Sequence, residues 1–180
     1  MSSLKTAQLF FVVVLTVLLV GCQKDPVVLD YQVYHSDMQP ILLNNGDLAE
    51  EFRDMAALVK RKQVSAGEIG TKLDDRLVPL AEKVVTDARN VTIKLDDLRL
   101  AHGELVAVWE ERVDCYRAII AAWKAEDLDA FDGAIQNNFA NKRQEELAIA
   151  AINDLLMVYS VTRDSDEELQ LYPTQPIADP

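Results

Sequence analysis

Apolar residues recur at alternating intervals of three and four along most of the chain, the spacing of one face of an α-helix. Between about residues 28 and 61, eight of nine positions on such a face are apolar or aromatic, and Asn45 is the polar exception. This heptad-like spacing predicts a long helix packed against partner helices. Pro40 and Gly46 allow a kink or a break in it between residues 40 and 46.

A second helix is expected to begin at Ser65. Ser65 and Glu68 have the spacing of a capping box, in which a hydroxyl and a carboxylate each accept a hydrogen bond from a backbone N–H group at the helix start. An apolar face continues from there to Ala88, and Pro79 interrupts it. Because proline removes one helical hydrogen bond, a kink is expected near Val78.

Two more helices complete the pattern. After an interruption at residues 90–92, the apolar face runs from about residue 95 to 126. Asp127 is a suitable N-cap for a last helix over about residues 128–161, so these two helices should form a tight hairpin.

The fold class predicted is all-α, an antiparallel helical bundle of about four long helices over residues 22–161. Residues 162–180 contain five acids and three prolines without apolar periodicity, which predicts a flexible acidic tail. Apolar residues make up 49% and charged residues 27% of the chain, a usage typical of a globular protein.

The N-terminus carries a targeting segment. Lys5 is followed by a largely apolar run over residues 9–20. Twelve helical residues span roughly 18 Å, less than the ~30 Å of a bilayer core, so the run is typical of a signal peptide and not of a membrane-spanning helix.

The tetrapeptide Leu19-Val20-Gly21-Cys22 resembles the lipobox of bacterial lipoproteins. The resemblance implies that residues 1–21 are cleaved off as a signal peptide, that Cys22 is lipidated, and that the protein is held at the membrane by this anchor. In Gram-negative cells the family's sorting rule retains proteins with Asp after the cysteine at the inner membrane. Gln23 stands at that position here, so an outer-membrane location is implied, without fixing the leaflet.

The charge balance limits the class of partner. The formal net charge is −12, and removal of residues 1–21 with Lys5 leaves 17 basic and 30 acidic residues, a net charge of −13. Such a chain lacks the basic surface that nucleic-acid binding needs, so no nucleic acid is expected. After lipidation of Cys22, Cys115 has no intramolecular partner and is either a small buried apolar residue or a thiol that is reactive or paired with another molecule.

The motifs of common bundle cofactors and enzymes are missing from the sequence. Gln32 and Arg99 stand three residues before the two histidines, where a di-iron bundle needs glutamates. Neither the Cys-x-x-Cys-His motif of covalent haem nor the His-Glu-x-x-His motif of zinc peptidases occurs. We therefore predict no catalytic residue, no metal and no cofactor, and the chain is not expected to be an enzyme.

Two clusters remain as candidate sites. His102, Trp109 and Tyr116 follow one another at intervals of seven on the third helix, where they are either core residues or the lining of a ligand pocket. A haem held between helices could draw its axial ligands from residues on several of them: His35, Met38, Met55, His102 and Met157.

The second cluster is a polar stretch in the fourth helix, which faces either a partner or a locally narrower core. Its candidate partner-facing residues are Asn137, Asn138, Asn141 and Arg143.

The leading functional hypothesis is an envelope lipoprotein that acts through contacts with an envelope protein, in a structural, scaffolding or assembly role. One alternative is a periplasmic carrier or sensor that binds a small apolar ligand or haem in the bundle core. Another is an escort of a secretion-system subunit, because small helical lipoproteins of secretion systems, the pilotins, have a similar architecture.

Overall fold

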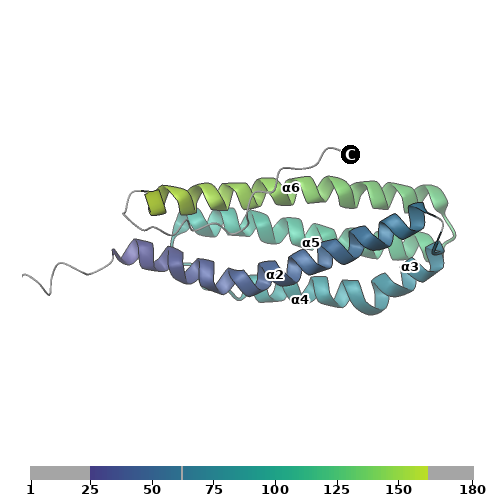
Figure 1. Cartoon of the computed structure of the whole chain (residues 1–180), viewed down its shortest axis with the longest axis horizontal. Coiled ribbons are helices and arrows are strands. Elements are labelled where there is room, and N and C mark those ends of the chain that lie inside the picture. Colours follow the sequence, from purple (N-terminus) through teal and green to yellow (C-terminus); the bar gives the residue numbers. More distant parts are fainter. Residues whose placement is uncertain (1–24, 62, 162–180) are drawn as a thin grey trace, which may run out of the picture.

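A computed structural model describes residues 25–61 and 63–161, and within these ranges every regular element is helical (Figure 1). The elements are α2 (Pro26–Lys60), α3 (Ala66–Lys72), the π-helical turn η1 (Leu73–Leu77), α4 (Val78–Arg89), α5 (Asp96–Lys124) and α6 (Leu128–Val161). The predicted signal peptide, Cys22 and the predicted tail lie outside the described residues.

The helices form an antiparallel bundle, as predicted. In Figure 1, α2, the joined rod of α3, η1 and α4, then α5 and α6 run side by side in alternating directions. The start of α2, the segment between α4 and α5, and the end of α6 therefore lie at one end of the bundle. The 29 residues of α5 give the bundle a length of about 44 Å at ~1.5 Å per residue.

Helix α2 is continuous, so the break allowed between residues 40 and 46 does not occur. Pro40 lies inside the helix with its ring exposed. Met38, Ile41 and Asn45, on either side of it, are all buried in the core. This packing keeps the helix unbroken across the missing backbone hydrogen bond, and Figure 1 shows α2 bent part-way along its length.

The second rod shows both features expected of it. The Glu68 N–H donates to Ser65 Oγ at 3.2 Å, and the Ser65 N–H donates to Glu68 Oε2 at 2.7 Å, which completes the capping box. The irregularity expected near Val78 is the π-helical turn η1, where the Val78 N–H donates to the Leu73 carbonyl. A wider turn relieves the clash of the Pro79 ring with the turn before it.

The connection between α5 and α6 is the predicted tight hairpin. Glu126 has a left-handed backbone with φ of 54°, and the Asp127 N–H donates to the Ala122 carbonyl at 3.0 Å, which ends α5 in a Schellman motif. Asp127 also caps α6, because its Oδ1 accepts from the Ala130 N–H at 2.9 Å. One residue thus ends one helix and starts the next.

The core contains most of the apolar positions that the spacing predicts, with three exceptions: Leu80 of α4, which is 42% exposed, and two residues of α6. Leu128 is 71% exposed because it lies in the first turn of α6, at the tip of the hairpin. Phe139 is 46% exposed and touches the core with one edge, against Phe52 at a centroid distance of 6.5 Å.

Two glycines of α3 let the rod approach α5 closely. A Cβ atom at Gly70 would lie 2.0 Å from the Trp123 ring, and one at Gly67 would lie 3.2 Å from the indole nitrogen. The Trp123 ring therefore packs directly on the backbone of α3, which fixes the end of the bundle opposite the start of α2.

We predict that Gly70→Ala destabilises the protein by about 2–3 kcal/mol, because the methyl group overlaps the ring and forces the helices apart. Gly103→Ala is the matched control, since nothing lies within 4 Å of its Cβ position and alanine favours helix, and it should stabilise by about 0.5–1 kcal/mol. Urea unfolding measures both. Equal effects of the two substitutions would contradict the close packing.

Candidate functional site

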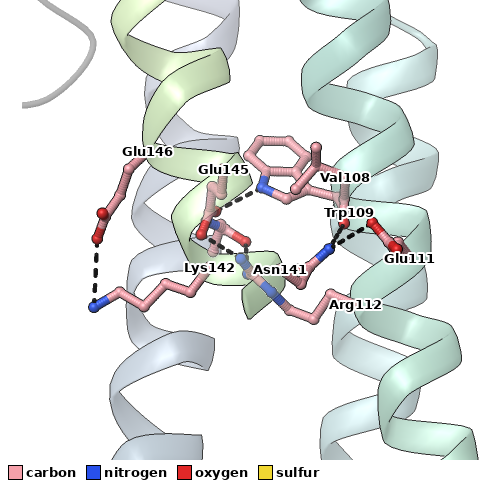
Figure 2. A network of polar contacts seen from close by, with 9 residues as sticks. Val108, Trp109, Glu111, Arg112, Asn141, Lys142, Glu145 and Glu146 are labelled. Atoms are coloured by element: carbon pink, nitrogen blue, oxygen red, sulfur yellow. Dashed lines mark hydrogen bonds and ion pairs between the residues drawn. The ribbon is translucent and has the colours of Figure 1, made fainter. Parts of the chain in front are cut away.

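A layer of buried polar side chains crosses the middle of the bundle (Figure 2). The Glu145 carboxylate of α6 forms an ion pair with Arg112 of α5. Its Oε1 atom accepts hydrogen bonds from Trp109 Nε1 at 2.7 Å and from Asn45 Nδ2 at 2.6 Å. Arg112 Nη1 donates to Asn45 Oδ1 at 2.7 Å, so the layer joins α2, α5 and α6.

The layer is closed to solvent. Arg112 and Glu145 are only 4% and 5% exposed. Burial of two charges costs several kcal/mol each, and the cost is offset only when both are paired and hydrogen-bonded, as they are here. The arrangement leaves neither charge open to a ligand, and it fixes the register of three helices.

Sequence reasoning singled out Asn45 and Trp109 but missed Arg112 and Glu145. Arg112 occupies the position between Trp109 and Tyr116 on the apolar face of α5, and Glu145 lies on the buried face of α6. The available signal was a basic residue on one apolar face and an acidic residue on another, which is the pattern of an internal ion pair.

The polar stretch of α6 divides between two faces. Asn138 and Asn141 are buried, whereas Asn137 and Arg143 are exposed. Asn141 Nδ2 donates to the Val108 carbonyl at 2.9 Å and to Glu111 Oε2 at 3.2 Å. The four residues therefore do not form one partner-facing surface, because the helical repeat turns two of them toward the core.

The two buried asparagines are not fully satisfied. Asn138 Oδ1 and Asn141 Oδ1 accept no hydrogen bond from the described residues. A buried acceptor left without a partner costs about 1–3 kcal/mol, so these two amide groups contribute less to stability than the fully hydrogen-bonded layer beside them.

His102 is a hydrogen-bonded core residue. Its Nδ1 lies 3.1 Å from the Tyr34 hydroxyl, and its Nε2 lies 3.1 Å from the Ala88 carbonyl oxygen. Both ring nitrogens are thus engaged within the protein. Burial lowers the pKa of His102, and the hydrogen bond to Ala88 offsets part of that shift.

Trp109, Tyr116 and His102 lie in separate layers of the core. Trp109 belongs to the polar layer, and Tyr116 stacks on Phe52 at a centroid distance of 5.1 Å. Burial raises the pKa of Tyr116 to about 12. The ligand pocket proposed for these three residues is therefore not assembled, because seven-residue spacing places each side chain two turns beyond the last.

Shallow hollows occur at both ends of the described bundle. The first, of about 510 Å³, lies beside His102 at the α2-start end, and there Arg89 is paired with Glu110 at 2.9 Å. It is lined by Arg89, Val91, Ile93, Arg99, His102, Gly103, Val106, Ala107 and Glu110. The second, of about 480 Å³, lies at the hairpin around Trp123, Leu128 and Phe131.

Cys115 is a buried, free thiol. Burial raises its pKa, and the nearby carboxylates of Glu111 and Asp114 raise it further, while Arg112 lowers it. A raised pKa keeps the sulfur in the unreactive thiol form, which fits the interpretation of Cys115 as a small apolar core residue.

Within residues 25–61 and 63–161, no three His, Cys, Asp or Glu side chains gather closely enough to hold a metal ion. No helix in that part of the chain is long and apolar enough to cross a bilayer. Comparison with protein-family models, curated proteins and solved structures found no match to this chain. By its described residues the protein belongs to the class of all-α antiparallel bundles with a buried ionic layer.

The ion pair is tested by single and double substitution. Arg112→Met leaves the buried Glu145 carboxylate without its counter-charge. Glu145→Gln keeps an acceptor for Trp109 Nε1 but leaves the buried Arg112 guanidinium without its counter-charge. Each should cost about 3–5 kcal/mol in the free energy of unfolding, and the neutral double variant should cost less than either. Lys83→Met, which breaks the exposed pair with Asp87, is the control and should cost at most about 0.5 kcal/mol. Additive losses in the double variant would argue against a coupled pair.

The pKa of His102 predicts a dependence of stability on pH. The unfolded chain takes up a proton near the ordinary value of 6.5, and the folded protein does so only at lower pH. The contribution of neutral His102 to the free energy of unfolding is therefore complete above about pH 6.5, and it is lost as the pH falls from there through the lower pKa of the folded protein. The difference in unfolding free energy between the wild type and His102→Gln should be smaller at about pH 5.5 than at about pH 7.5. A difference that does not change with pH would refute the shift.

Proposed function

We propose that the protein is a lipid-anchored protein of the bacterial envelope whose helical bundle acts through contacts with other proteins. The observation that carries the proposal is the tetrapeptide Leu19-Val20-Gly21-Cys22 directly after a twelve-residue apolar run. Gln23 favours the outer membrane if the source is Gram-negative.

The start of the bundle supports this assignment. Helix α2 begins at Pro26, four residues after Cys22. An extended chain spans at most ~3.6 Å per residue, so that end of the bundle would lie within about 14 Å of the lipid. A bundle held this close to a membrane is well placed to meet other envelope proteins.

The interior of the bundle favours protein contacts over the carriage of a core ligand. His102, Trp109 and Tyr116 each make contacts within the core. The two charges of the polar layer, on Arg112 and Glu145, pair with each other. The surfaces left for recognition are the exposed helix faces and the two ends.

The anchor is tested by Cys22→Ser. The wild type should take up labelled palmitate and remain in the membrane fraction, and the variant should lose the label and be released, because two or more acyl chains hold a protein at a bilayer. Cys115→Ser is the matched control and should behave as the wild type, since Cys115 is buried. Membrane retention of an unlabelled Cys22→Ser protein would contradict the proposal.

A further inference from the structure

The outward surface of α6 carries more apolar residues than a solvated helix face needs. At ~100° per residue, eight exposed residues between positions 139 and 158 fall within one arc of about 100° on the side away from the core. Ala140 and Met157 are two of them, and the other six, here termed the outer stripe, are Phe139, Arg143, Leu147, Ala150, Asp154 and Val158. Leu147 and Val158 are 61% and 60% exposed. Because a helix that is apolar on opposite faces is usually covered on both, the stripe indicates an interface.

The two charges of the outer stripe have opposite signs. Neither Arg143 nor Asp154 forms an ion pair with any other residue in the described part of the chain. They stand at equal distances on either side of the point between residues 148 and 149. The stripe is thus charge-complementary to itself when it is reversed end to end.

The apolar residues of the stripe repeat this symmetry. About the same point, Leu147 mirrors Ala150 and Phe139 mirrors Val158, so a larger side chain stands opposite a smaller one. A two-fold axis makes each such contact twice, which is the property of an isologous interface. We propose that the outer stripe is a homodimer interface, in which α6 of one copy packs antiparallel against α6 of a second copy.

Other arrangements of two stripes fit less well. A parallel pair in register sets Arg143 against Arg143 and Asp154 against Asp154, which repel. Moving the axis by two residues toward the end of α6 sets Arg143 against Val158 and Asp154 against Leu147, which removes the charges from water without pairing them. Only the axis between residues 148 and 149 pairs both charges and keeps the apolar residues together.

The dimer has a consequence for the proposed anchor. The end of α6, where α2 also starts, lies about 19 Å from the axis, so the two starts of α2 stand about 40 Å apart at opposite ends of the dimer. Both lipids reach one bilayer when the helices lie along its surface. Dimerisation itself does not rest on the anchor, so it can be tested on the protein without lipid.

The test uses sedimentation equilibrium of the Cys22→Ser chain without residues 1–21, in the presence of reductant. We expect a reversible dimer. Arg143→Asp and Asp154→Arg should each weaken dimerisation at least about tenfold, because each sets two pairs of like charges together. An equimolar mixture of the two variants should recover wild-type affinity, since the substituted side chain of each copy then faces an opposite charge in the other.

Two further variants show whether the stripe itself is responsible. Leu147→Glu should abolish the dimer, because it places a carboxylate beside the axis. Glu104→Arg, an exposed charge reversal on α5, should leave the dimer unchanged. Circular dichroism confirms that each variant is folded.

Three results would overturn the proposal. They are a wild-type chain that stays monomeric at concentrations on the order of 100 µM, a dimer that survives Leu147→Glu, and a mixture of the two charge variants that associates no better than either alone. A monomeric wild type would mean that the outer stripe serves a different occupant.

Discussion

The buried ion pair between Arg112 and Glu145 is the constraint on which the bundle depends. Apolar helix faces can slide past one another by a turn at little cost, whereas two charges removed from water must meet at one level. Asn45 and Trp109 complete the hydrogen bonding of the carboxylate, so α2 and α6 can take only one register along α5.

The two ends of the bundle are fixed in other ways. At the hairpin, Asp127 ends α5 and caps α6, and Trp123 rests on the backbone of Gly70, where no side chain intervenes. At the other end, His102 links Tyr34 of α2 to the Ala88 carbonyl of α4. The contacts of Trp123 and His102 also tie α3 and α4 to α5, and the ion pair does not reach these two helices.

The same contacts decide where recognition can occur. Residues that the sequence suggests as ligand-binding, such as His102 and Trp109, make their polar contacts inside the protein. Apart from the edge of Phe139 that meets Phe52, the outer stripe of α6 faces away from the core. This division favours a protein whose interior specifies its shape and whose outer faces meet its partners.

The sequence by itself determined the helices and their ends, because helical periodicity, the capping box at Ser65 and the cap at Asp127 act over a few residues. It also indicated Asn45 as a polar position on the apolar face of its helix. Only the tertiary structure decided that Asn138 faces the core, and that Arg112 and Glu145 meet. Their 33-residue separation carries no local signal, since pairing depends on how two helices are rotated and aligned, and that is settled by packing across the whole core.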